Sequence, residues 1–520
     1  MCLGPSARAQ SGSINEPASS PYAVAVGAVD AVPIASGGAC GADENVGGTF
    51  PLEQFSSQGP TVDGRVKPDI AAFDGVAGNV YTTFCGTSAS APHVAGAAAL
   101  VSAANPDMDA AQIQNLLEQR ANAGSPLNPP NNQVGHGVLN LGDPSNITPP
   151  AGSGYTPLDS PRRILDTRTT TGEHRAPLGP GGTVDVRMPA AVPTDATAVA
   201  INLTGIATAT TYLSVYPGPG WPGTSNLNVA KTTDTPAAVF ATVPIGSGRT
   251  ITVRNSTGST NAVVDVLGYF APNGPNAPGK YGKVTPQRLL DTRTTTGGHQ
   301  GTLGNGKTLT LHVPASSGVP VVSSTSVIVN LTSTGQSTSG YLSVSPDCSH
   351  SSSTLNYVKG YTRANLAIVK LSSTSTFCVY GVGGPTHVVI DVVGYLAPSG
   401  VASYVPMPSP VRIVDTRTGN GGRLGGLGAG GIMPLQGAGI FDVPYQATAV
   451  LTNFVATGAT TGSFLATYPG SARPKVSTLN FTAGRTVPNA AVVNLSSGKA
   501  TIFNSVGSVQ VVTDLFGYFI

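Results

Sequence analysis

The sequence predicts a multidomain protein in which an α/β domain, a parallel sheet with helices, precedes three all-β domains of the sandwich or jelly-roll type. Two observations lead to this fold class. Near the N-terminus, short apolar runs of the kind found in parallel sheets covered on both faces precede two helical segments. Further along, one heptapeptide recurs as RILDTRT, RLLDTRT and RIVDTRT at 163–169, 288–294 and 412–418, and each copy opens a stretch rich in β-branched residues.

The α/β prediction depends on a few segments before residue 145. VAVGAV (24–29) and DIAA (69–72) are apolar runs suited to buried parallel strands. An Ala-rich helix is expected to begin near Ser88, and a second helix is expected over 109–122, whose first residues have the spacing of a capping box.

The segment GTSASAPHVAG (86–96) resembles the nucleophile segment of a subtilisin-like serine protease. VAVGAV and FSSQGPTVDGRVKPDI (55–70) precede it in the order found in that family. The resemblance implies a serine endopeptidase in which Ser88 attacks a peptide bond of a protein or peptide substrate, with no cofactor and no metal. It covers residues 1–145, which resemble the C-terminal half of such a catalytic domain.

The same resemblance also shows what this sequence lacks. A serine hydroxyl needs a hydrogen-bonded base that is itself oriented by a third group, and the family takes both from DTG-like and HGT-like strings before the serine. Neither string, nor any histidine, occurs before Ser88. His93 lies five residues along the same helix, so its ring is expected to point away from Ser88. Gln10, in RAQSGS, stands where the family has its oxyanion Asn.

Residues 1–145 are therefore expected to be a truncated and inactive catalytic domain. In subtilisin, loss of the nucleophile or the base lowers turnover by about a millionfold. The N-terminal residues show no signal peptide, and no apolar run is long enough to span a membrane. The low charged fraction of 10%, with 66 Gly and 43 Pro, is typical of an extracellular or cell-surface protein. A net charge of +2 gives no reason to expect a nucleic-acid partner.

The rest of the sequence consists of three similar segments, predicted as β domains over 155–272, 280–398 and 404–520. Each segment carries the heptapeptide near its start and ends alike, in VVDVLGYF, VIDVVGYL or VTDLFGYF. Runs of Val, Ile, Thr and Tyr with period two alternate with Gly, Pro and Ser clusters, a pattern of antiparallel sheets. The segments resemble a tandem module, marked by LDTR and GYF strings, of secreted actinobacterial proteins.

Each segment carries the same acidic and basic residues, and we expect them to hold its ends together. On a strand, residues two apart share a face. If the first and last strands are neighbours, Arg168 would bridge to Asp265 by a bidentate contact, and Asp166 would cap a turn. The alternative is a ligand site on the same residues, for a cell-wall glycan or Ca²⁺. The corresponding residues of the other segments are Asp291, Arg293 and Asp391, and Asp415, Arg417 and Asp514.

Four of the five cysteines are expected to form disulfides. Cys348 and Cys378 lie in the second segment, and Cys40 and Cys85 would form a second bond beside the nucleophile segment, which leaves Cys2 unpaired. No spacing typical of metal ligands occurs. Sequons at Asn202, Asn330 and Asn480 are interpreted as strand residues. Trp221 is interpreted as a loop residue, with stacking on a sugar as the alternative.

Two functions follow from these observations. The first is a secreted subtilisin-like endopeptidase whose β modules tether or present the catalytic unit. The second is a non-catalytic cell-surface, adhesion or glycan-binding protein built on the three β segments.

Overall fold

The computed structural model describes most of the chain, in two compact units. The described residues are 9–31, 40, 51–77, 82–104, 108–122, 130–141, 152–231, 236–272, 279–320, 326–350, 352–441, 443–444 and 446–520. The first unit comprises 1–148 with 439–445, and the second comprises 149–438 with 446–520. Among the described residues, no helix is both long and apolar enough to cross a membrane.

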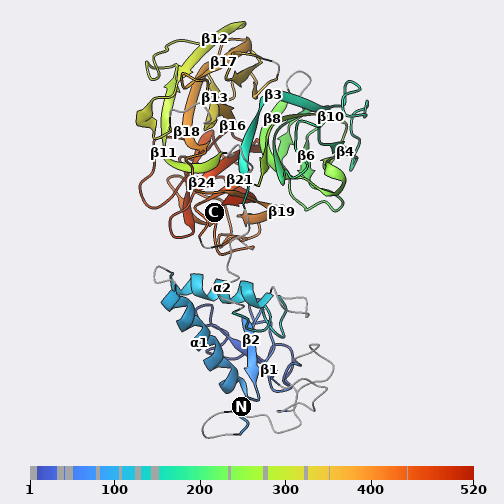
Figure 1. Cartoon of the computed structure of the whole chain (residues 1–520), viewed down its shortest axis with the longest axis vertical. Helices are drawn as coiled ribbons and strands as arrows, with labels where there is room; N and C mark the ends of the chain where they lie inside the picture. Colours follow the sequence, from blue (N-terminus) through green and yellow to red (C-terminus); the bar gives the residue numbers. More distant parts are fainter. Residues whose placement is uncertain are drawn as a thin grey trace. The chain divides into compact units, whose positions relative to one another are not determined.

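The first unit contains a small parallel sheet with two helices (Figure 1). Strands β1 (Val26–Asp30) and β2 (Ile70–Asp74) pair in parallel, and both lie against α1 (Thr87–Ala104). Apolar side chains from one face of the sheet and from both helices form one cluster, which explains why these runs fold together. Helix α2 (Ala110–Asn122) follows the capping box that its sequence predicts: Gln112 N donates to Asp109 Oδ1 at 2.9 Å, and Asp109 N donates to Gln112 Oε1 at 2.7 Å.

The second unit is built from six four-stranded antiparallel sheets, two from each segment. In the first segment the sheets run β3 (Gly154–Asp166), β10 (Thr260–Ala271), β5 (Ala198–Ala207), β8 (Ala237–Pro244), and β4 (Thr183–Arg187), β9 (Thr250–Asn255), β6 (Thr211–Tyr216), β7 (Leu227–Val229). In the second they run β11 (Lys280–Asp291), β18 (His387–Ala397), β13 (Ser326–Thr334), β16 (Arg363–Lys370), and β12 (Lys307–His312), β17 (Thr376–Gly383), β14 (Gly340–Ser345), β15 (Leu355–Tyr357). In the third they run β19 (Tyr404–Asp415), β26 (Gln510–Phe519), β21 (Ala449–Thr457), β24 (Val487–Asn494), and β20 (Ile432–Gln436), β25 (Lys499–Asn504), β22 (Ser463–Tyr468), β23 (Leu479–Phe481). Two short 3₁₀ helices, Ser247–Arg249 and Ala315–Ser317, complete the described elements.

The predicted fold class, a partial α/β domain followed by three sandwich or jelly-roll domains, is wrong. The described residues are nearly all β, and their six sheets have a six-bladed, propeller-like arrangement. The parallel sheet of the first unit has two strands only among the described residues, so it is a minor part of the structure. The prediction gave the apolar runs before residue 145 too much weight, because such runs indicate buried strands but not how many strands pair.

The three segments of the second unit are also not independent. One hydrophobic cluster takes residues from all three, including Phe270, Tyr281, Tyr404 and Phe519, and the Phe270 and Tyr404 ring centroids are 4.3 Å apart. The edge strands β8, β16 and β24 contact one another in every pairing. A segment separated from the others would therefore expose part of its core.

Buried asparagines close the three segments into a ring. Asn202 Nδ2 of the first segment donates to Ser353 O of the second at 2.7 Å. Asn330 Nδ2 of the second donates to Ser477 O of the third at 2.8 Å, and Asn453 Nδ2 of the third donates to Ser225 O of the first at 2.9 Å. All three asparagines are at most 3% exposed, so the hydrogen bonds form in a low-dielectric interior, where they count for most.

Candidate functional site

Ser88 is the second residue of α1, and its side chain is exposed. The start of this helix is held from two directions. Asp74, at the end of β2, accepts a hydrogen bond from the Gly86 N–H at 2.7 Å, and Cys85 forms a disulfide with Cys40. The nucleophile segment is thus a fixed turn that leads into a helix.

No base lies beside Ser88 among the described residues. Its hydroxyl makes no hydrogen bond to another described residue, and the two histidines of the first unit are engaged elsewhere. His93 is exposed, and its Nδ1 lies 2.9 Å from Ala89 O on its own helix. His136 Nε2 lies 3.5 Å from Glu118 Oε2, and burial raises the pKa of that glutamic acid to about 7. Within the described part of the chain, neither histidine of the first unit is hydrogen-bonded to Ser88, as an activating base would be.

Gln10, the candidate oxyanion residue, is exposed and precedes β1. Its backbone carbonyl accepts a hydrogen bond from Ser13 N at 3.2 Å, whereas its side-chain amide makes no hydrogen bond to another described residue. The structure does not bring Gln10 and Ser88 into contact within the described part of the chain. An oxyanion donor must be held in place before the reaction, so Gln10 remains a prediction.

Three buried carboxyl groups lie close to the nucleophile segment, and the sequence analysis does not find them. Asp30 and Asp74 end β1 and β2 in register, and all three groups, Glu53 included, are fully buried. Burial, with the nearby Asp74 and Asp30 charges, raises the pKa of Glu53 to about 8. Burial in this cluster thus favours the protonated form of Glu53. The nearby Cys40 Sγ is part of a disulfide, so it is not available as a thiolate metal ligand.

The arginine that bonds the aspartate of the last strand in each segment is not the predicted one. Arg163, not Arg168, bonds Asp265, with Nε–Oδ1 and Nη2–Oδ2 distances of 2.9 and 3.2 Å. Arg168 instead folds onto Asp166, and Asp166 Oδ1 also accepts the Arg168 N–H at 3.2 Å. β3 and β10 are neighbours, as the prediction requires, and Asp166 does cap the turn that follows β3.

The same contacts recur in the other two segments. Arg288 bonds Asp391 while Arg293 bonds Asp291, and Arg412 bonds Asp514 while Arg417 bonds Asp415. The missed arginine opens each RILD, RLLD or RIVD string, so its recurrence was the signal that could have found it. All carboxylates of these clusters are buried and paired, which leaves little room for a ligand on them.

The other predicted residues occupy structural positions. Cys348 pairs with Cys378, as Cys40 does with Cys85, whereas Cys2 lies outside the described residues. Trp221 stacks on Tyr212 with centroids 6.2 Å apart, and the Arg254 guanidinium lies over its ring at 4.3 Å, so protein groups already contact this ring. Of the sequon asparagines, Asn202 and Asn330 belong to the buried ring described above, and Asn480 Nδ2 bonds Ser477 Oγ at 3.0 Å.

Comparison with known proteins finds similarity in the first part of the chain. Residues 6–137 match the model of the subtilase family, Peptidase_S8. The chain is 41% identical over 87 residues to Alkaline elastase YaB of Bacillus sp. (strain YaB), which covers 16% of this chain and 21% of that protein. It is 32% identical over 144 residues to Bacillopeptidase F of Bacillus subtilis (strain 168), with 25% and 9% covered. It is 33% identical over 141 residues to Subtilisin Savinase of Lederbergia lenta, with 27% and 44% covered.

The chain thus spans less than half the length of each of these relatives. Among solved structures, "The Triple Jelly Roll Fold and Turret Assembly in an Archaeal Virus" aligns with a TM-score of 0.15 and 10% identity, over 71% of this chain and 89% of that chain. No conclusion about the fold follows from that score. By sequence, residues 6–137 match the subtilase family of serine proteases.

Proposed function

We propose that residues 6–137 carry the nucleophile part of a subtilase-type site and that Ser88 is not activated in this chain. The observation that carries the proposal is the absence of any histidine before Ser88, together with the engagement of His93 and His136 away from it. A serine without a base attacks a peptide carbonyl slowly, because its hydroxyl stays protonated at neutral pH. Hydrolysis of a protein or peptide substrate by this chain alone would then be close to background.

A fluorophosphonate probe tests this proposal, because it labels only activated serines. The purified full chain and its Ser88→Ala variant should label equally weakly, far below an active subtilisin at the same concentration. Ser102→Ala is the matched control, since Ser102 is an exposed serine of the same helix. Labelling that Ser88→Ala abolishes and Ser102→Ala retains would show an activated serine and overturn the proposal.

We further propose that the chain acts outside the cell as a non-catalytic binding protein through its second unit. Two disulfides support an oxidising compartment. The ring of buried asparagines links the three segments of the second unit by hydrogen bonds, which suits a surface or adhesion role. Sedimentation with purified cell walls tests it: the full chain should co-sediment, and Ser88→Ala should co-sediment equally. A full chain that stays in the supernatant would contradict this role.

A further inference from the structure

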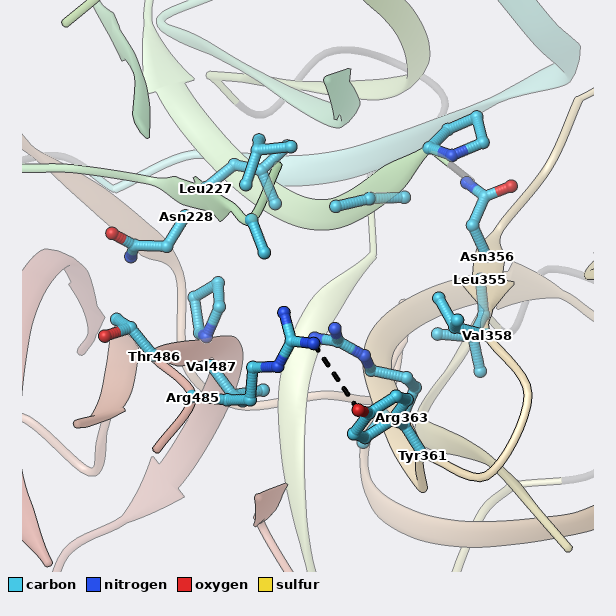
Figure 2. A pocket seen from close by; sticks show the side chains of 17 residues that line it. Leu227, Asn228, Leu355, Asn356, Val358, Tyr361, Arg363, Arg485, Thr486 and Val487 are labelled. Carbon is cyan, nitrogen blue, oxygen red and sulfur yellow. Dashed lines mark hydrogen bonds between the residues drawn. The ribbon is translucent and has the colours of Figure 1, made fainter. Parts of the chain in front are cut away.

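The second unit has a partly open cavity of about 60 Å³ where the edge strands β8, β16 and β24 meet. Figure 2 shows its lining, which all three segments supply. Much of the lining is apolar, including Leu227, Leu355 and Val487. Among the described residues that line the cavity, the charged side chains are two arginines, Arg363 and Arg485, and none is acidic.

The two guanidinium groups enter the cavity from different segments and lie close together (Figure 2). Arg485 precedes β24 and is held by Tyr361: its Cζ lies 5.2 Å from the ring centroid, and its Nη2 donates to the Tyr361 hydroxyl at 3.4 Å. Arg363 begins β16, and its guanidinium has no hydrogen bond or ion pair with another described residue. Arg485 is thus held in place by Tyr361, whereas the N–H donors of Arg363 are available to a ligand.

The electrostatics of this pair are unfavourable without an anion. Burial and the neighbouring Arg485 charge lower the pKa of Arg363, which means that the surroundings disfavour its positive charge. The other half-buried arginines of this unit that face buried carboxylates, Arg163, Arg288 and Arg412, each bond one. Two neighbouring cations with no acidic lining residue leave a charge for a ligand to neutralise.

Arg363 is also not part of the repeated framework. Ala237, Arg363 and Val487 occupy the same register position of β8, β16 and β24, three residues before the residue that faces Asn202, Asn330 or Asn453. In the other two segments a small or apolar side chain, Ala237 or Val487, occupies this position. The fold therefore does not need a charge there, in contrast to Arg163, Arg288 and Arg412, which recur in all three segments.

We propose that this cavity binds a tetrahedral oxyanion, a phosphate or sulfate group, between Arg363 and Arg485. Guanidinium groups match such oxyanions in shape and charge. A cavity of about 60 Å³ holds roughly four to six water-sized groups, which suits the five heavy atoms of a phosphate and excludes a whole sugar ring. The group is carried by a free ion or by an anionic polymer whose chain continues outside.

Thermal unfolding of the full chain at low ionic strength, titrated with inorganic phosphate or sulfate, tests the site. The wild type should unfold at higher temperature as the anion is added. Arg363→Gln should bind at least tenfold more weakly, and Arg473→Gln should behave as wild type, because Arg473 packs over Phe503 at 4.1 Å and does not line this cavity. Equal anion-dependent shifts in the wild type and Arg363→Gln would overturn the proposal.

A second measurement separates a ligand site from an internal ion pair. Without anion, Arg363→Gln should be at least as stable as the wild type, because it removes a half-buried charge that has no partner among the described residues. Asp234, which lies outside the described residues, provides the check: if Asp234→Asn and Arg363→Gln were equally destabilised, an internal pair would replace the proposed site. A poly(glycerol phosphate) chain is then compared with free phosphate as a competitor. If it competes at a tenfold lower phosphate concentration, the bound group belongs to a polymer; if both compete equally per phosphate, the ligand is the free ion.

Discussion

Arg288 holds Asp391 by two parallel hydrogen bonds, with Nε–Oδ1 and Nη2–Oδ2 distances of 2.9 and 3.3 Å. The contact joins β11 to β18, the first and last strands of the second segment. The Asp391 side chain is 1% exposed, whereas the Arg288 side chain is 29% exposed. This pair therefore anchors the segment ends through a charge that water does not reach.

Arg288→Ala should destabilise the second unit much more than Arg293→Ala. Removal of Arg288 leaves the buried Asp391 charge unpaired, which costs about 3 kcal/mol. Arg293 is 48% exposed, so its loss should cost about 1 kcal/mol or less. Chemical denaturation of the full chain measures both, and the full chain is needed because the three segments share a core. Equal losses in the two variants would refute the assignment of the anchor to Arg288.

Asn453→Ala should open the ring of segments. Its Nδ2 donates to Ser225 O at 2.9 Å and to Asn226 O at 3.2 Å, so the substitution leaves two carbonyls of the first segment short of a donor. The expected loss of stability is about 1–3 kcal/mol. Asn480→Ala is the control, because Asn480 bonds Ser477 within its own segment. Thermal unfolding that falls equally in both variants would mean that ring closure contributes nothing.

Asp291 should contribute to the loss of folding stability at acid pH. Hydrogen bonds from Arg293 lower the pKa of Asp291 to about 2, below the ordinary value of 3.8. A carboxyl group whose pKa is lower in the folded state stabilises that state at pH values above the pKa of the unfolded state. This contribution is lost as the pH falls from about 4 to 2. Asp291→Asn should therefore lose less stability than the wild type across this window. Denaturation midpoints measured between pH 5 and 2 show the difference, and parallel curves would contradict it.

The predictions from sequence worked where a local rule decides the outcome, as for the capping box of Asp109 and Gln112. The period-two rule failed at Arg168 for a physical reason. β3 ends at Asp166, so Arg168 lies in the turn, where alternation of faces no longer applies. The shared core was missed because Tyr281 and Tyr404 come from different segments, and no local pattern records which distant side chains meet. Glu53 shows no motif at all, since only the fold buries it beside Asp74.

The first unit should lose stability as the pH rises, because Glu53 binds its proton more tightly in the folded state. Its pKa is raised from 4.5 to about 8, so its contribution is fully present below pH 4.5 and is lost as the pH rises through about 8. The slope is at most about 1.4 kcal/mol per pH unit. Glu53→Gln cannot ionise and should flatten the profile between pH 5 and 8, whereas Asp63→Asn, at an exposed carboxyl, should keep it. Denaturant unfolding at each pH, followed by a hydrogen-exchange pulse at one common pH, reports on β1 and β2.

Because Asp74 also accepts a hydrogen bond from the Gly86 N–H, ionisation of Glu53 should loosen the turn before Ser88 first, and peptides covering 84–90 should exchange earliest. A wild-type profile as flat as that of Glu53→Gln would mean that Glu53 is already ionised at neutral pH.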